Sequence, residues 1–120
     1  MPNLYNVYKR IFQEFMEYHR ATVDMLNAAM QASSDEFYLF GAHIFSTFLI
    51  ALGLEQWRIR GILDNSPTKE GRRLYGTNFV VMTPNILQGH KYVSVILRAG
   101  IYNKEIMEGI LRINPTVKFV

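Results

Sequence analysis

The first residues with chemistry suited to ligand binding are Gly41-Ala42-His43, directly after a short apolar run. Glycine permits the sharp turn that leads from a strand into a helix. The first N–H groups of the helix that follows, together with its positive end, are suited to bind a phosphate group. His43 adds a side chain that donates a hydrogen bond to a phosphate or transfers a proton. We therefore expect Gly41, Ala42 and His43 to contact a phosphate.

An acidic residue stands at the spacing at which nucleotide-binding folds contact ribose. Asp64 follows Gly41 by 23 residues and ends a second apolar run. A carboxylate at this place accepts hydrogen bonds from ribose or sugar hydroxyls, and Asn65 beside it belongs to the predicted site. The equally favoured alternative is that Asp64 caps the turn formed by Asn65, Ser66 and Pro67. The residues alone leave both interpretations open.

A cation and two aromatic side chains complete the predicted ligand site. Arg98 follows the most β-prone run of the chain, and its guanidinium group is suited to bidentate contact with a phosphate. The alternative for Arg98 is a surface ion pair with Glu105 or Glu108. Tyr75 and Tyr102 are expected to line the pocket.

The motifs that identify an enzyme are incomplete. The dinucleotide fingerprint G-x-G-x-x-G has only its first glycine, because Ala42-His43-Ile44-Phe45-Ser46 follows Gly41. We find no P-loop, nucleophile elbow, carboxylate dyad or pair of metal ligands. The sequence therefore assigns no catalytic residue and no certain cofactor, and it is compatible with a nucleotide-sugar ligand.

The elements that must position these residues begin with a strand–helix–strand unit. Phe37–Phe40 is a short aromatic strand, Gly41 begins a turn, a helix continues to about Leu54, and Ile59–Leu63 is a second strand. Such a unit makes two parallel strands. Its first turn is the place where folds of this kind bind anionic groups.

Strands and helices continue to alternate after this unit. The alternation with short connections predicts an α/β fold, a small Rossmann-like doubly wound parallel sheet of order 3-2-1-4-5. Ligands of such sheets bind beyond the carboxyl ends of strands one and four, where the winding reverses. The expected elements are a strand over Phe79–Val81, a short helix over Thr83–Leu87, a strand over Val93–Leu97, a helix over Tyr102–Leu111 and a last strand over Val117–Phe119.

A long helix is predicted to precede the sheet. Over residues 4–32 the pattern contains neither Gly nor Pro, and apolar residues recur at three- and four-residue steps. We treat residues 1–34 as this N-terminal helix and residues 35–120 as the α/β domain. Because the helix is longer than a small sheet needs, it packs across the sheet or pairs with a second copy, and we expect a homodimer. Tyr18 and His19 fall on the apolar stripe and are interpreted as packing residues.

Composition and charge exclude several classes of protein. The 120 residues, 49% hydrophobic and 19% charged, fit one globular domain. A net charge of +3 with scattered basic residues predicts no nucleic-acid partner. The absence of cysteine excludes disulfides and thiolate metal sites. No apolar run has bilayer-spanning length and the first residues do not resemble a signal peptide, so we expect a cytoplasmic protein without membrane contact.

Three groups of residues resemble one known domain. They are Gly41-Ala42, the run Gly61-Ile62-Leu63-Asp64-Asn65-Ser66-Pro67-x-Lys69-x-Gly71-Arg72-x-x-Tyr75-Gly76-Thr77, and Tyr102-x-x-Glu105-Ile106. Together they resemble the C-terminal domain of S-adenosylmethionine-dependent C-methyltransferases that act on nucleotide-linked deoxysugars, and its relatives in bacterial surface-polysaccharide clusters. The resemblance covers roughly residues 36–120. It implies a Rossmann-like domain that helps to hold the nucleotide sugar, while a separate domain binds the methyl donor.

The chain departs from that family at two motifs. Ile44-Phe45-Ser46 stands where the family usually has Lys-Gly, and Gly100-Ile101 replaces an aromatic-Asn pair. The methyl-donor domain of the family has no counterpart in the sequence. The resemblance therefore implies a nucleotide-sugar cradle, and not methyl transfer by this chain alone.

These observations lead to one functional hypothesis and two alternatives. We expect a stand-alone accessory domain that binds a nucleotide-linked sugar, or a methyltransferase partner chain, in carbohydrate (surface polysaccharide) biosynthesis. The first alternative is a structural self-association module with no ligand. The second is a small oxidoreductase-like enzyme that depends on a nucleotide cofactor, which the incomplete glycine pattern disfavours.

Overall fold

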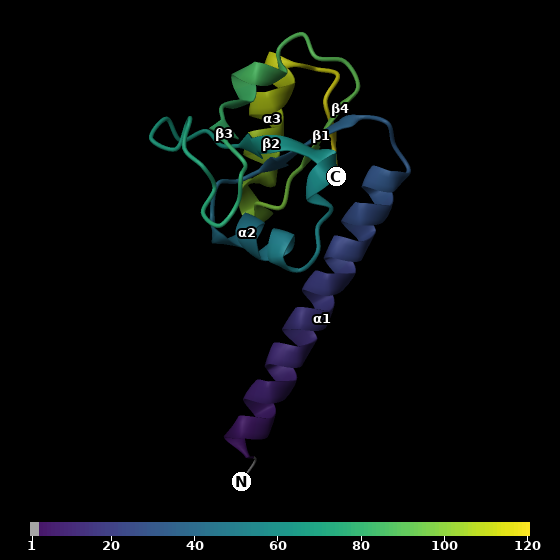
Figure 1. The fold of residues 1–120 in the computed structure, drawn as a ribbon, viewed down its shortest axis with the longest axis vertical. Helices are drawn as coiled ribbons and strands as arrows, with labels where there is room; N and C mark the ends of the chain where they lie inside the picture. The colour runs from purple at the N-terminus through teal and green to yellow at the C-terminus, as the bar shows by residue number, and fades with distance from the viewer. Residues whose placement is uncertain (1–2) are drawn as a thin grey trace.

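Short apolar strands that alternate with helices form a five-stranded sheet in the computed structural model, which describes residues 3–120 (Figure 1). Every neighbouring pair of strands is parallel, and the order is β3-β2-β1-β4-β5. The prediction of an α/β, Rossmann-like doubly wound sheet of order 3-2-1-4-5 is therefore confirmed. The strands are β1 (Glu36–Phe40), β2 (Ile59–Leu63), β3 (Val81–Met82), β4 (Val93–Ile96) and β5 (Lys118–Phe119).

Helices and single helical turns fill the connections between the strands. The helix after β1 ends at Ala51 and not near Leu54, because Gly53 follows with a positive φ of 106° that turns the chain out of the helix. The helix after β4 begins at Asn103, after a single 3-10 turn. The α-helices are α1 (Leu4–Gln31), α2 (Ile44–Ala51) and α3 (Asn103–Ile113), and the 3-10 turns are η1 (Gln56–Arg58), η2 (Pro84–Leu87) and η3 (Gly100–Tyr102).

The third strand lies later in the chain than the sequence predicts. A strand was expected over Phe79–Val81, and β3 occupies Val81–Met82. Val80 instead forms an isolated antiparallel bridge with Arg73. The chain after β2 therefore folds back on itself before it enters the sheet, and this hairpin-like return places Arg73 beside Val80, just before β3.

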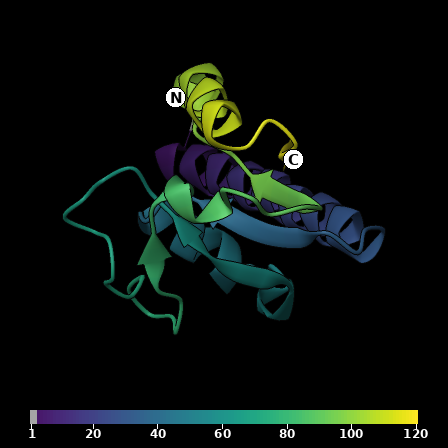
Figure 2. The same ribbon diagram turned by 90° about the horizontal axis from the view of Figure 1, so that it is seen from above.

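Two apolar cores lie on opposite faces of the sheet. Leu26 of α1 and Leu49 of α2 are fully buried with Leu39 of β1 in one core. Ile110 of α3 is buried with Val95 of β4 in the other. Figure 2 shows α2 on one side of the sheet and α3 on the other. The winding of the sheet reverses between β1 and β4, and the crossovers before and after this point run over opposite faces. The loops at the carboxyl edge therefore lead into two different helical layers.

The N-terminal helix α1 contacts the domain from Phe15 to its C-terminal end. Val23, Leu26 and Met30 are its buried residues. The part before Phe15 projects away from the sheet, which gives the molecule a long axis of 59 Å (Figure 1). The Asn3 side chain caps the helix by accepting a hydrogen bond from the Tyr5 N–H at 3.0 Å. No helix in the described part of the chain, α1 included, is long and apolar enough to cross a bilayer.

A polar network ties together the amino edge of the sheet. The buried carboxylate of Asp35 accepts hydrogen bonds from the Ser94 hydroxyl at 3.0 Å and from the Lys118 Nζ at 3.2 Å. The Arg58 guanidinium donates to the Ser33 carbonyl at 2.6 Å. These contacts join the α1–β1 connection to β4 and β5. The polar groups of this edge are thus committed to the fold, whereas the predicted ligand residues lie at the carboxyl edge.

The anchoring of α2 is testable with two substitutions in the same helix. Leu49 is 0% exposed and Ile44 is 86% exposed. Leu49→Ala is expected to lower the free energy of unfolding by about 2–5 kcal/mol, because it removes buried methyl groups and leaves a cavity. Ile44→Ala is expected to change it by less than about 0.5 kcal/mol. Urea unfolding measures both, and equal losses in the two variants would contradict this packing of α2.

Candidate functional site

The turn after β1 has the sharp geometry that the sequence predicts for it. Gly41 is buried and has a φ of 115°, a conformation that favours glycine. A Cβ at this position would collide with the imidazole ring of His43, which folds back over the turn. The Gly41 N–H donates to the Leu63 carbonyl at 2.7 Å, and the Ser46 hydroxyl donates to the Gly41 carbonyl at 2.6 Å. The backbone of Gly41 is therefore engaged within the chain.

Asp64 joins the loop after β1 to the loop after β2. Its Oδ2 accepts a hydrogen bond from the Ala42 N–H and its Oδ1 one from the Ser66 N–H, both at 2.8 Å. The Lys69 Nζ donates to the Ala42 carbonyl at 3.0 Å and lies 4.0 Å from Asp64 Oδ2. The hydrogen bond from the Ser66 N–H thus forms the turn cap that was considered as the alternative role of Asp64. The Ala42 N–H, predicted to bind phosphate, donates to this carboxylate.

A cavity of about 360 Å³ opens between the first turn of α2 and the loop after β2, and we name it the α2-side cavity. Three cations, Lys69, Arg72 and Arg73, line it together with His43. Of the described residues that line it, none is Asp or Glu. An excess of positive charge beside a helix N-terminus favours an anionic ligand. The remaining lining residues are Ala42, Ile44, Thr47, Leu74, Tyr75 and Val81.

The loop that carries these cations is anchored by a buried leucine and turned by a glycine. Leu74 is 5% exposed and packs in the core beneath α1 and α2. Gly71 has a φ of 80°, which turns the chain just before the arginines. Arg72 and Arg73 are exposed and lie between that turn and the buried Leu74. The loop is therefore held in place while its charged side chains remain accessible.

The site predicted from the sequence does not include Lys69, Arg72 and Arg73, which line the α2-side cavity. Lys69, Arg72 and Arg73 occupy a polar loop, and such loops are usually solvated surface. The available signal was the clustering of Lys-x-Gly-Arg-Arg directly after the Asp64 turn. Tyr75, which was predicted to line the pocket, does line the α2-side cavity, with 90% of its side chain exposed at the mouth.

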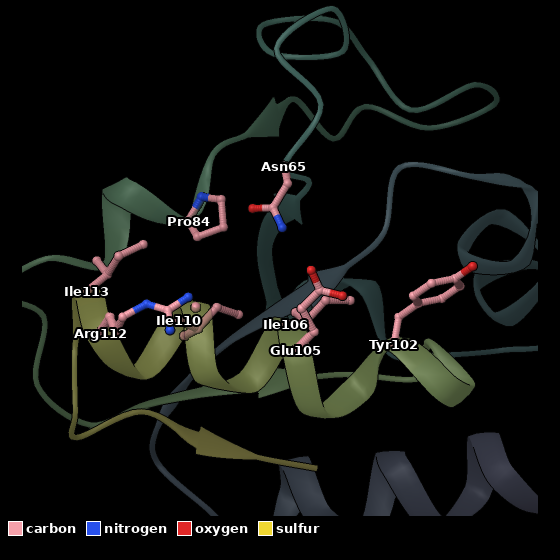
Figure 3. Close-up of a pocket in the computed structure, with 9 residues that line it drawn as sticks. Asn65, Pro84, Tyr102, Glu105, Ile106, Ile110, Arg112 and Ile113 are labelled. Atoms are coloured by element: carbon pink, nitrogen blue, oxygen red, sulfur yellow. The ribbon is translucent and has the colours of Figure 1, made fainter.

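A second cavity, of about 480 Å³, lies on the α3 face of the sheet, and we name it the α3-side cavity (Figure 3). Two predicted site residues, Asn65 and Tyr102, line it. Figure 3 shows the Asn65 amide and the Glu105 carboxylate pointing toward each other across the opening, with Arg112 further along α3. One carboxylate and one guanidinium give this cavity no excess charge. The other lining residues are Pro84, Ile106, Gly109, Ile110 and Ile113.

The predicted site residues therefore do not gather at one place. Ala42, His43 and Tyr75 line the α2-side cavity, whereas Asn65 and Tyr102 line the α3-side cavity. The sheet separates the two helical layers to which these cavities belong. A ligand small enough for one cavity contacts only one of the two groups.

Arg98 belongs to neither of these lining sets. It follows β4, is half-buried, and its Nε is buried without a hydrogen-bond partner. It forms no ion pair with Glu105 or Glu108 within residues 3–120. The surface ion pair considered as its alternative role is therefore not formed, and the predicted contact of Arg98 with a phosphate stays a prediction.

The remaining candidate residue, His19 of α1, has a packing role. The His19 ring is surrounded by aromatic rings, with centroids 4.3 Å from Phe15 and 5.4 Å from both Phe45 and Phe48. His19 thus packs against α2, as its position on the stripe indicates. Among the described residues, no group of three or more His, Cys, Asp or Glu side chains is arranged to hold a metal ion.

Comparisons of the chain with models of protein families, with curated proteins and with solved structures find no match. Function is therefore inferred from the geometry and charge of the cavities. The α2-side cavity has the stronger chemical signature of the two, because its charge has one sign.

The role of Asp64 is testable by removing both of its acceptor oxygens or only one of them. Asp64→Ala leaves the Ala42 and Ser66 N–H groups without their acceptor and is expected to lower the free energy of unfolding by about 1–3 kcal/mol. Asp64→Asn keeps one acceptor oxygen and should cost less. Urea unfolding and hydrogen exchange of the Ala42 amide measure the effect. Asp24→Ala, on the exposed side of α1, is the control, and equal stability of the Asp64→Ala and Asp24→Ala variants would disprove the bridge.

Proposed function

We propose that the α2-side cavity binds the diphosphate and sugar of a nucleotide-linked sugar. The observation that carries this proposal is the lining of the cavity by Lys69, Arg72 and Arg73, with no carboxylate among its described lining residues. Guanidinium groups bind phosphate oxygens in bidentate geometry, and an ammonium group adds a compact positive charge. The cavity is thus suited to a ligand whose negative charge is concentrated in phosphate groups.

The size and the walls of the cavity support a small organic phosphate. Its volume of about 360 Å³ falls within the roughly 300–1,000 Å³ of small-molecule sites. Leu74 and Val81 supply apolar wall, and the Thr47 hydroxyl is available to sugar hydroxyls. Tyr75 offers an exposed ring at the mouth for stacking on a sugar or a base. His43, at the N-cap of α2, adds a donor beside the cations.

The proposal changes the roles of the residues that the sequence selects. Phosphate contact moves from the engaged Gly41 and Ala42 backbone to the three cationic side chains of the loop. His43 and Tyr75 keep a ligand role. Asp64 positions the loop.

The proposed biological setting follows from the resemblance to the C-terminal domain of sugar C-methyltransferases. An accessory domain in the cytoplasm that holds a nucleotide-linked sugar, next to a methyltransferase partner chain in carbohydrate biosynthesis, is the proposed context. The proposal assigns no catalytic residue to this chain. An oxidoreductase-like role is less favoured, because the turn at Gly41 lacks the second glycine of the dinucleotide fingerprint.

Calorimetric titration with UDP-glucose, dTDP-glucose and inorganic pyrophosphate tests the cavity. Replacing Arg72 and Arg73 together by Ala is expected to weaken binding of the nucleotide sugars by roughly tenfold or more, since each charged hydrogen bond contributes on the order of 1.5–3 kcal/mol. Higher salt should weaken binding by the wild-type chain, because the contacts are between exposed charges.

Arg112→Ala is the matched control, since it removes one guanidinium from the α3-side cavity. It should leave the affinity unchanged. Absence of heat with all three ligands would refute a phosphate site. Loss of affinity in Arg112→Ala, with wild-type affinity in the Arg72 and Arg73 double variant, would move the site to the α3 face.

A further inference from the structure

The exposed side of α1 carries a regular apolar seam. Its residues follow one another at steps of four and three, as in a coiled coil. The six apolar members each expose between 48% and 68% of their surface. We define the α1 seam as Leu4, Tyr8, Ile11, Phe15, Tyr18, Thr22 and Met25.

The α1 seam is distinct from the side of the helix that contacts the domain. The domain-facing residues, Val23, Leu26 and Met30, are fully buried. At 3.6 residues per turn this buried stripe lies roughly 90° around the helix from the seam. The domain therefore leaves most of the seam exposed, although the Phe15 ring lies 5.6 Å from the ring of Phe48 in α2, and the projecting N-terminal part in Figure 1 has no other element beside it.

We propose that the α1 seam pairs with the α1 seam of a second copy of this chain, in an antiparallel two-helix contact. A helix that presents a four-three seam is complementary to another helix with the same period. A second copy provides that period and that pattern of side chains. The contact is isologous, since each copy offers the same surface.

The area of the seam is sufficient for a stable dimer. Tyr5 and Phe12 flank the seam and are 70% and 62% exposed. A large apolar side chain that is half to two-thirds exposed loses on the order of 100 Å² when a partner covers it. The seam and its two flanking residues then bury on the order of 800 Å² on each copy, which is the typical area per partner of a stable interface.

Bulk favours the antiparallel arrangement. In a parallel pair the two domains would lie side by side at the same end of the helices. In an antiparallel pair centred near Gln13 the two domains lie at opposite ends. Glu14 meets its counterpart near the centre, but Arg10 of the same helix lies 4.0 Å away and compensates its charge.

Sedimentation velocity over a concentration series tests the pairing. The wild-type chain is expected to be a dimer. Replacing Tyr8 and Ile11 together by Glu should weaken association roughly a hundredfold or more, because charges then face each other across an apolar seam. Since both residues project beyond the domain, the fold is expected to remain, which circular dichroism checks. The control replaces Asn6 and Gln13, on the opposite side of the helix, by Glu, and should stay dimeric.

Orientation is tested by disulfide cross-linking in a chain that has no cysteine of its own. The proposed register places Tyr8 of one copy opposite Tyr18 of the other. A mixture of the single variants Tyr8→Cys and Tyr18→Cys should cross-link to each other under mild oxidation. Cross-linking of the Tyr8→Cys variant to itself, with no mixed product, would overturn the antiparallel arrangement.

A monomeric wild-type chain throughout the concentration series would overturn the proposal. A monomer that co-sediments with anionic phospholipid vesicles, and loses this binding when Tyr8 and Ile11 are replaced by Glu, would identify a lipid surface as the occupant instead. A dimer that persists unchanged in that double variant would also overturn the proposal, since its interface would lie elsewhere.

Discussion

A single carboxylate holds together the edge of the sheet at which ligands are expected. Asp64 accepts one hydrogen bond from the loop after β1 and one from the loop after β2. Both loops leave neighbouring parallel strands at the same edge, so their backbones must be fixed relative to each other before any side chain on them has a defined position. The half-buried carboxylate, with Lys69 close to it, provides that connection. The α2-side cavity is bounded by these two loops, so its shape depends on the hydrogen bonds of Asp64.

The same connection decides the electrostatics of the edge. The Ala42 N–H donates to the Asp64 carboxylate and the Gly41 N–H to the Leu63 carbonyl, so the first amides of the turn, which bind anions in dinucleotide folds, are already engaged. The positive charge is supplied instead by side chains on the loop after β2. Arg72 and Arg73 form no ion pair within residues 3–120. The cavity therefore offers flexible cationic side chains instead of a rigid backbone cradle.

The α1 helix divides its surface between two different uses. One side supplies the core with Leu26 and Met30, while the adjacent seam keeps large apolar side chains in contact with water. Exposed apolar surface of this extent is uncommon on a monomer, and its regular spacing distinguishes it from scattered surface residues. The helix is longer than the sheet, so the turns before Phe15 project beyond the domain.

The sequence by itself determined the class of fold, because its evidence is local. Glycine and proline positions, β-prone runs and helical periodicity are written in neighbouring residues, and the right-handed crossover rule converts that order into strand order 3-2-1-4-5. The same local evidence located the sharp turn at Gly41, which has a positive φ in the structure.

Tertiary structure alone decided how the site residues are grouped and which roles they have. Asn65 and Tyr102 face one helical layer and His43 faces the other, and this depends on how each loop leaves the sheet. Of the two roles considered for Asp64, the turn cap is formed by its hydrogen bond from the Ser66 N–H, and contact with ribose stays a prediction. The cations of the loop line the α2-side cavity next to Leu74, which is buried in the core with α1 and α2. Such contacts join residues far apart in the chain, so no local pattern of residues encodes them.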